Sequence, residues 1–239
     1  MLSKNQIKLI TSLKHKKFRQ QHGLFVAEGK KTITELLRSV LKLNTLYTTE
    51  PFKSNAKTEV LISEKDLARI SFLKTPNTAL AVFEIPQPKP IDCNSLIVAL
   101  DDVRDPGNLG TIIRLCDWFG IAHLVCSPNT ADCYNPKVVQ ASMGSITRVN
   151  IVYANLAHFL KETNKPVYGA FMDGENIYGT NLPKEGILVM GNEANGISKT
   201  IEALVNHRVS IPRFGLLQQT ESLNVATATA ILLSEFKRR

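Results

Sequence analysis

Residues 96–116 carry the sequence LIVALDDVRDPGNLGTIIRLC, and this stretch decides the expected fold. Its first five residues form an unbroken apolar run, which is typical of a strand buried on both faces of a parallel sheet. Apolar residues then recur at helix spacing from Leu109 to Phe119. Between them lie residues 105–108, DPGN, which favour a turn. The stretch therefore predicts a strand, a tight turn and a helix, which is the repeating unit of an α/β protein.

The same alternation of strand and helix patterns continues to the C-terminus. Apolar runs predict strands at residues 124–126, 149–152, 167–171, 187–190 and 209–211. Helices are expected at residues 109–119, 137–143 and 156–160, from Ser198 to about residue 205, and at residues 222–236. Such alternation predicts a mostly parallel sheet that is covered by helices.

A proline-rich break at residues 86–90, PQPKP, separates this region from the N-terminal part of the chain. Alternating prolines favour an extended linker, because they cannot continue a helix. We therefore expect a first domain at residues 1–86, a linker at residues 87–94 and a second domain at residues 95–239. The first domain is expected to be a small mixed α/β fold. Its predicted elements are helices at residues 6–13, 31–41 and after a Ser63 cap, a basic loop with Gly23, and strands at residues 25–27, 45–48, 60–62 and 79–85.

The composition is that of a globular protein with a sizeable core, since 44% of the 239 residues are hydrophobic and 21% are charged. No apolar run approaches the roughly 18 residues that a membrane span needs, and no apolar signal core follows the basic N-terminus. We therefore expect a cytoplasmic protein without a membrane partner. The cysteines lack the C-x-x-C spacing of metal sites, so neither a metal nor a disulfide is expected. They are Cys93, Cys116, Cys126 and Cys133.

The net charge of +8 is concentrated near the N-terminus. Residues 1–50 contain ten Lys or Arg and three acidic residues, which gives this segment a net charge of +7. The asymmetry favours a polyanionic partner such as RNA at the first domain, although a solvated Lys-rich surface has the same composition. The first candidates for phosphate contacts are Lys14, Lys16, Lys17 and Arg19.

Two loops follow predicted strands of the second domain, at the edge of the sheet where α/β proteins bind ligands. In the first loop, Asn108 opens a helix whose free amides attract anions, and Arg114 lies off the apolar stripe. The second loop, residues 191–196 (GNEANG), has glycines that allow close approach to a ligand and Glu193 for polar contacts. It lacks the Lys-Ser/Thr pair of a P-loop and the G-x-G-x-x-G pattern of a dinucleotide site. Each loop alone is also compatible with an ordinary turn and solvated side chains.

A third short stretch, residues 222–224 (SLN), opens the predicted C-terminal helix. Ser222 is expected to cap this helix. Asn224 is a poor helix former and is expected to turn its amide toward the same edge of the sheet. The alternative is a buried core helix with an ordinary cap.

Together, residues 105–110 with Arg114, residues 191–196 and residues 222–224 resemble, in order and spacing, the three motifs of the SpoU family of RNA 2′-O-ribose methyltransferases. Residues 3–17 and 25–29 also resemble the substrate-binding domain that precedes many of these enzymes. The resemblance covers nearly the whole chain.

This resemblance implies a SPOUT fold, in which a mostly parallel α/β sheet ends in a C-terminal trefoil knot. The first domain would be a small α/β RNA-binding domain like that of kink-turn-binding ribosomal proteins. The implied activity is transfer of a methyl group from S-adenosylmethionine to a ribose 2′-hydroxyl of structured RNA, by a homodimer. The extra domain favours 23S-type ribosomal RNA, and transfer RNA is the alternative substrate.

The resemblance also implies the residues of the site. The cofactor would be held around Met190, Gly191, Ile211 and Leu223. The catalytic set would be Asn108, Arg114, Glu193, Ser222 and Asn224. In the family the arginine is proposed to accept the ribose proton, but a guanidinium with a pKa above about 12 is better suited to stabilising an alkoxide or holding a phosphate. The other four side chains would orient Arg114 and the ribose.

One segment departs from the family pattern, and two other functions fit parts of the sequence. The loop at residues 213–221 is longer than in family relatives, so none of its side chains is assigned, and we expect a surface insertion. A non-catalytic RNA-binding protein of the same fold is one alternative, but the joint presence of five catalytic candidates argues against it. A nucleotide-binding α/β enzyme of another class, such as a reductase, is the other alternative, and the missing phosphate fingerprint argues against it.

Overall fold

The computed structural model describes residues 2–52, 58–215, 217 and 222–238 of the chain. The chain divides into two compact units. The first comprises Met1–Gln87 and Asp132–Thr147, and the second comprises Pro88–Ala131 and Arg148–Arg239. The break after Gln87 lies in the proline-rich stretch that the sequence marks as a linker. Residues 132–147, which the sequence analysis placed in the second domain, group with the first unit.

The first unit is built on a four-stranded sheet with the strand order β1-β4-β2-β3. Strand β4 is antiparallel to both β1 and β2, and β3 is parallel to β2. The strands are β1 (Leu24–Glu28), β2 (Leu43–Thr48), β3 (Glu59–Leu61) and β4 (Ala79–Glu84). The helices are α1 (Lys4–Ser12), α2 (Lys16–His22), α3 (Lys30–Leu37), α4 (Glu64–Ile70) and α6 (Pro136–Ser142), with a 3-10 turn η1 (Ser145–Thr147). The expected small mixed α/β fold is confirmed.

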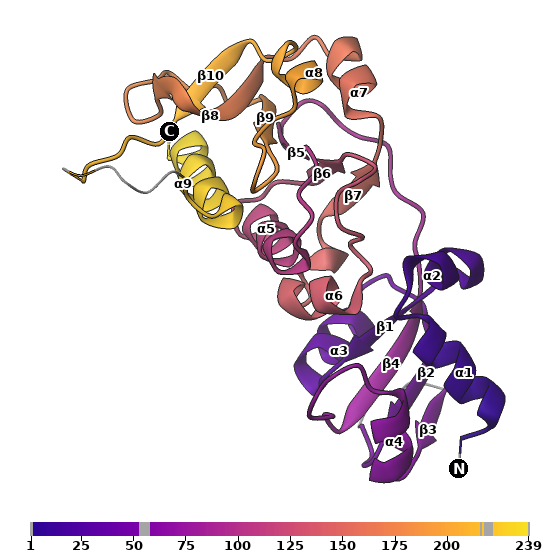
Figure 1. Ribbon diagram of the computed structural model, residues 1–239. Coiled ribbons are helices and arrows are strands. Elements are labelled where there is room, and N and C mark those ends of the chain that lie inside the picture. Colours follow the sequence, from indigo (N-terminus) through magenta and orange to yellow (C-terminus); the bar gives the residue numbers. More distant parts are fainter. Residues whose placement is uncertain (1, 53–57, 216, 218–221, 239) are drawn as a thin grey trace. The chain divides into compact units, whose positions relative to one another are not determined.

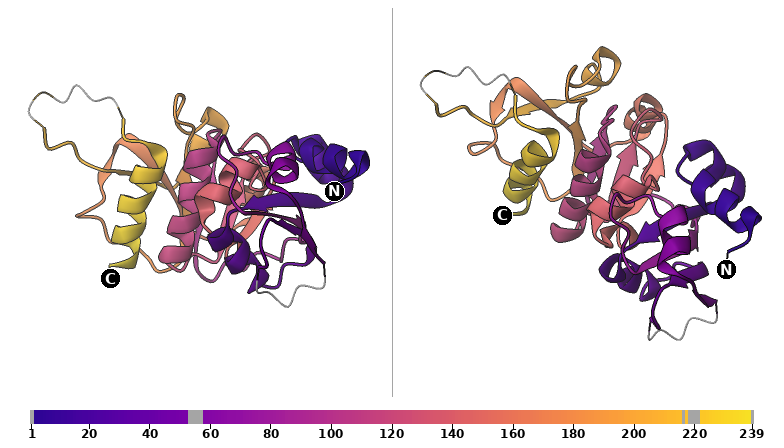
Figure 2. Two further views of the ribbon diagram at one scale, coloured as in Figure 1. Left: turned by 90° about the horizontal axis from the view of Figure 1, so that it is seen from below. Right: turned by 60° about the horizontal axis from the view of Figure 1, so that its bottom comes forward.

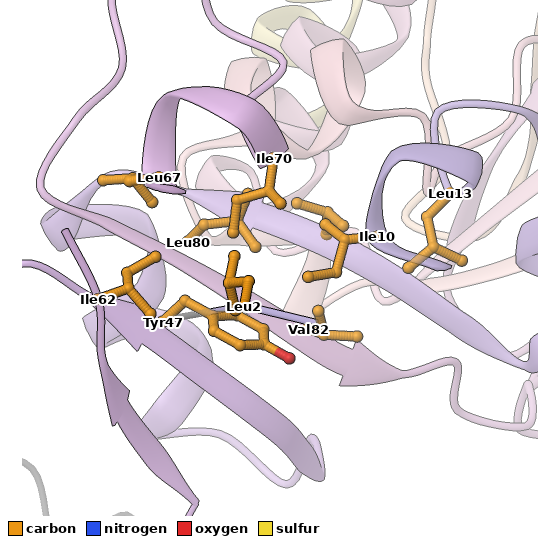
Figure 3. Close-up of a cluster of buried hydrophobic side chains, with 10 residues drawn as sticks. Leu2, Ile10, Leu13, Tyr47, Ile62, Leu67, Ile70, Leu80 and Val82 are labelled. Carbon is orange, nitrogen blue, oxygen red and sulfur yellow. The ribbon is translucent and has the colours of Figure 1, made fainter. Parts of the chain in front are cut away.

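The core of the first unit lies between this sheet and helices α1 and α4 (Figure 3). Leu80 and Val82 are two residues apart on β4 and therefore point to the same face of the sheet. Ile10 of α1 and Ile70 of α4 pack in the same cluster and are fully buried. These contacts explain the apolar positions that the sequence shows in both helices.

One helix of the first unit was not anticipated, because residues 16–22 were expected to lie in a basic loop and instead form α2. The helix ends at Gly23, whose φ of +63° is the left-handed conformation that glycine adopts readily. Arg19 is 2% exposed, and its guanidinium pairs with Asp132 at 2.5 Å and donates to the Leu13 main-chain oxygen at 2.8 Å. The prediction that Arg19 contacts a phosphate is therefore wrong, because its guanidinium is buried and paired with Asp132 inside the first unit.

The second unit is built on a six-stranded sheet with the strand order β10-β8-β9-β5-β6-β7, and each neighbouring pair runs parallel. The strands are β5 (Leu96–Leu100), β6 (His123–Cys126), β7 (Asn150–Tyr153), β8 (Val167–Asn176), β9 (Gly186–Met190) and β10 (His207–Ser210). The helices are α5 (Pro106–Trp118), α7 (Leu156–Glu162), α8 (Lys199–Glu202) and α9 (Val225–Lys237). The predicted parallel sheet is confirmed.

Helices cover both faces of this sheet. Ile97 and Ala99 of β5 pack with Leu156 of α7 and Ile201 of α8 in one buried cluster. The alternate residues of β5 point to the opposite face, where α5 and α9 lie side by side (Figure 1 and Figure 2). Burial on both faces explains why all five residues of β5 are apolar.

Two elements of the second unit differ in length from the prediction. Helix α5 begins at Pro106, three residues earlier than expected, because Asp105 acts as its N-cap and accepts from the Asn108 amide at 2.8 Å. Strand β8 continues to Asn176, well beyond the expected end. Along this extension Gly174 lies against the main chain of β10, where an added Cβ would come within 2.7 Å of backbone atoms.

Candidate functional site

The loops that follow β5 and β9 leave the sheet side by side. The two strands are parallel neighbours, and their last residues, Leu100 and Met190, are paired in register. Because parallel strands have their carboxyl ends at the same edge of the sheet, the loop after β5 and the loop at residues 191–196 meet there. This is the edge at which the sequence predicts ligand binding.

Three polar side chains from distant parts of the sequence form a hydrogen-bonded row at this edge. The Asn224 Nδ2 donates to Asn108 Oδ1 at 2.9 Å, and the Asn108 Nδ2 donates to Glu193 Oε1 at 2.9 Å. Asn108 lies in the first turn of α5, Glu193 follows β9, and Asn224 precedes α9. An ionised Glu193 accepts but cannot donate, so the Asn108 amide group must face it. We call these three side chains the Asn–Asn–Glu row, and it unites one candidate from each of the three stretches.

Asn224 also holds the start of α9. Its Oδ1 accepts from the amides of Ala226 at 2.9 Å and Thr227 at 3.2 Å, which makes Asn224 the N-cap. The expectation that Ser222 caps this helix is wrong, because the helix begins at Val225 and Ser222 lies two residues before the cap. Ser222 is exposed and lines the cavity described below.

Arg114 lies outside the Asn–Asn–Glu row. It is on the exposed side of α5, and it forms no hydrogen bond or ion pair with the residues that the structure describes. Trp118 follows one turn later on the same side and is 83% exposed. This side of α5 therefore presents a cation and an aromatic ring to solvent.

A cavity of about 1100 Å³ lies next to the row, and Glu193 lines it. All four residues expected around the cofactor line this cavity: Met190, Gly191, Ile211 and Leu223. The sequence analysis did not identify Phe171 of β8 or Ala228 and Leu232 of α9, which line it too. Ala228 and Leu232 are four residues apart and share one side of α9, but such spacing in a sequence indicates a core position equally well.

The residues around the cavity fit S-adenosylmethionine. The volume of about 1100 Å³ lies slightly above the roughly 300–1,000 Å³ typical of sites for drug-sized ligands, so the cofactor has room, and apolar walls suit an adenine ring. At Gly191 an added Cβ would come 2.3 Å from main-chain atoms of Gly196 and Ile197. Glycine at this position lets the loop fold back on the end of β9, where two main-chain hydrogen bonds between Asn192 and Gly196 close it.

The remaining candidate residues are the lysines of the first unit that are expected to bind RNA. Lys14, Lys16 and Lys17 are exposed, as a residue that contacts phosphate must be.

Among the described residues, no group of three or more His, Cys, Asp or Glu side chains could hold a metal ion. Within the same part of the chain, no helix is both long and apolar enough to cross a bilayer.

The fold and this site define a class of enzyme. Residues 95–234 match the SpoU rRNA Methylase family, and residues 4–81 match the MRM3-like substrate binding domain. The chain therefore belongs to the SpoU rRNA methylase family. It is an RNA 2′-O-ribose methyltransferase, as the sequence predicts.

Individual relatives are similar along the whole chain. A TrmH-family protein from Porphyromonas gingivalis is 41% identical with a TM-score of 0.91, and the match covers 100% of this chain and 99% of the other. An rRNA methyltransferase from Sinorhizobium meliloti, solved with AdoMet bound, is 30% identical with a TM-score of 0.87 and coverage of 100% and 96%. The 23S rRNA (guanosine(2553)-2′-O)-methyltransferase RlmP of Bacillus subtilis (strain 168) is 31% identical over an aligned length of 241 residues, and the match covers 97% of this chain and 96% of RlmP.

Proposed function

We propose that this protein methylates the ribose 2′-hydroxyl of a guanosine in 23S ribosomal RNA. The activity named for the Bacillus subtilis relative, which is similar over 97% of the chain, supports this substrate. The observation that carries the proposal is the position of the Asn–Asn–Glu row beside the cavity. With the methyl donor in the cavity, the row holds polar groups where the reacting ribose must lie.

The residues of the row act by orientation. When bound, S-adenosylmethionine supplies an electrophilic methyl group on its sulfonium sulfur. Glu193 and Asn108 present an acceptor and an amide to the ribose hydroxyls and direct the 2′-oxygen toward the cavity. Asn224 fixes the amide plane of Asn108, and Ser222 adds a hydroxyl at the cavity wall.

Arg114 acts through its positive charge, which stabilises negative charge on the substrate. As the 2′-oxygen formed its bond to the methyl carbon, the carbon–sulfur bond would break with release of S-adenosylhomocysteine, and the hydroxyl proton would pass to solvent water. A guanidinium has a pKa above about 12 and stays charged, so Arg114 stabilises the developing alkoxide or the adjacent phosphate and does not accept the proton. A pH–rate profile of Arg114→Lys tests this role, and unchanged turnover would exclude a specific need for the guanidinium.

A further proposal concerns the quaternary state and the same side of α5. We infer that a second copy of the chain covers Trp118, so that the active site with Arg114 lies near the interface of a homodimer. The family resemblance supports this assembly.

Two further features are proposed from the family resemblance. Residues 1–86 bind structured RNA, with Lys14, Lys16 and Lys17 on phosphates. The C-terminal part of the chain is knotted, and single-molecule pulling from residues 95 and 239 tests this. A knotted chain stops at a shorter final length than an unknotted chain of the same number of residues.

Calorimetric titration with S-adenosylmethionine and S-adenosylhomocysteine tests the cofactor site. The wild-type protein is expected to bind with about micromolar affinity. Gly191→Ala, whose Cβ would meet the main chain, is expected to abolish binding. Gly215→Ala is the matched control, because Gly215 lines the same cavity and has open space around it.

Mapping of 2′-O-methyl groups after incubation with unmodified RNA tests the substrate. Methylation of one guanosine in 23S ribosomal RNA is expected. Methylation of transfer RNA and not of 23S ribosomal RNA would show that the proposed substrate is wrong and that transfer RNA is the substrate. A folded protein that neither binds the cofactor nor methylates RNA would favour the non-catalytic RNA-binding protein.

A further inference from the structure

The loop that carries Glu193 is shaped by the side chain of Asn192. The Asn192 Oδ1 accepts from the amides of Ala194 at 2.9 Å and Asn195 at 3.1 Å, which forms a turn around Glu193. The Asn192 Nδ2 donates to the main-chain oxygen of Asp102 at 2.7 Å. One side chain therefore folds the loop and also ties it to the segment that follows β5. The sequence analysis identified neither Asn192 nor Asp102 as part of the site.

Asp102 is held in the conformation that presents this oxygen. Its φ is +62°, which residues other than glycine rarely adopt. The Asp102 amide donates to Ser127 Oγ at 2.9 Å, and its carboxylate accepts from the Ser127 hydroxyl at 3.2 Å and from Arg104 at 2.8 Å. Burial raises the pKa of the Asp102 carboxyl, but the hydrogen bonds from Arg104 and Ser127 outweigh this effect and the pKa lies below its usual value. A strained residue held by this many contacts is typical of functional sites.

The C-terminal end of the loop is attached to Asp101, the residue that precedes Asp102. The Ser198 amide donates to Asp101 Oδ2 at 2.7 Å, and the Asp101 amide donates to the Met190 main-chain oxygen at 2.9 Å. Asp101 is 6% exposed, so this attachment is sheltered from water. With both ends of the loop fixed, the position of Glu193 within it depends on the turn that Asn192 forms.

We propose that Asn192 is a positioning residue for methyl transfer. By binding the Asp102 main-chain oxygen, it holds the loop so that the Glu193 carboxylate meets the Asn108 amide. This inference rests on the proposed function, because Asn192 acts through Glu193. A residue that only stabilised the fold would affect the rate equally whether or not Glu193 were present.

Asn192→Asp is the informative substitution. It replaces the Nδ2 donor with an oxygen that faces the Asp102 carbonyl, and it retains an oxygen for the two loop amides. Asn195→Asp is the matched control, since it makes the same charge change in the same loop at an exposed side chain. In single-turnover methylation with enzyme in excess, Asn192→Asp is expected to be at least about tenfold slower, and Asn195→Asp to stay within about twofold of the wild type.

A double-mutant cycle with Glu193→Ala shows through which residue Asn192 acts. In the Glu193→Ala background, adding Asn192→Asp is expected to slow the reaction by less than about twofold. Hydrogen exchange gives a readout that does not depend on activity, and it shows whether Asn192→Asp loosens the loop itself. The amides of residues 191–198 are expected to exchange faster in Asn192→Asp than in Asn195→Asp.

Two outcomes would overturn the proposal. One is an unchanged rate and unchanged exchange in Asn192→Asp, and the other is an equal slowing in both backgrounds. If Glu193→Ala alone retains the wild-type rate, the role of Glu193 in the proposed function fails, which is a different result from a failure of Asn192.

Discussion

At the scale of single residues, burial gives two neighbouring cations of α2 opposite roles. Arg19 is 2% exposed and paired with Asp132, whereas Lys17 is exposed. Arg19→Ala leaves the Asp132 carboxylate without its partner and is expected to lower the free energy of unfolding by about 3–5 kcal/mol, measured by urea denaturation. Lys17→Gln is expected to change stability by less than about 0.5 kcal/mol and to reduce the salt slope of RNA binding by about one unit. An unchanged salt slope would mean that Lys17 contacts no phosphate.

Glu28, also at the scale of single residues, makes a pH-dependent contribution to the free energy of unfolding. Burial raises the pKa of its carboxyl, although hydrogen bonds from the Ser71 hydroxyl at 2.5 Å and the Phe72 amide at 2.8 Å act against this. Because the folded pKa lies above the unfolded value, the folded state binds more protons, and stability falls as pH rises from the unfolded toward the folded pKa. The stability of Glu28→Gln relative to the wild type is therefore expected to rise between pH 4 and pH 7. Guanidinium denaturation at several pH values measures this difference, and a flat difference would contradict the raised pKa.

At the scale of elements, the sequence predicts what depends on local pattern. Strand β5 was predicted at its observed bounds, because burial on both faces leaves an unbroken apolar run. The N-cap of α9 was not predicted correctly, since Ser222 and Asn224 are both good capping residues and the sequence does not say where the helix begins. Parallel topology predicts that Asn108 and Glu193 share an edge of the sheet. The direction of their hydrogen bonds could not be predicted, because it depends on how α9 packs beside α5.

The start of α9 allows the capping role of Asn224 to be separated from its proposed role in the active site. Asn224→Ala removes both and is expected to lower the free energy of unfolding by about 1 kcal/mol and to slow methylation. Asn224→Asp retains the cap oxygen but loses the donor to Asn108 Oδ1. If Asn108 turned its amide toward the new carboxylate, its own oxygen would face Glu193. Asn224→Asp is therefore expected to restore stability and not activity, and recovery of both would show that the row is dispensable.

At the scale of the whole molecule, the two units are joined by more than the linker. The chain passes between them after Gln87, after Ala131 and after Thr147. In the first unit, Tyr134 packs on Phe25 with ring centroids 4.8 Å apart. Prolines made the linker visible in the sequence, whereas the placement of residues 132–147 depends on such tertiary contacts and leaves no local pattern. Because the first unit also contains residues 132–147, which the sequence pattern places in the second region, the complete chain is the appropriate material for these measurements.

The exposed side of α5 gives the prediction that belongs to the assembly. If a second copy covers Trp118, Trp118→Glu removes a buried ring and places a charge in the interface, so the dimer dissociation constant is expected to rise at least about tenfold. Val40→Glu is the control, because Val40 is 87% exposed and belongs to the first unit, whereas Trp118 belongs to α5 of the second unit. Sedimentation equilibrium measures both. A monomeric Trp118→Glu protein that binds S-adenosylmethionine but does not methylate RNA would place the reacting ribose at the interface. A dimer as tight as the wild type would mean that another surface joins the two copies.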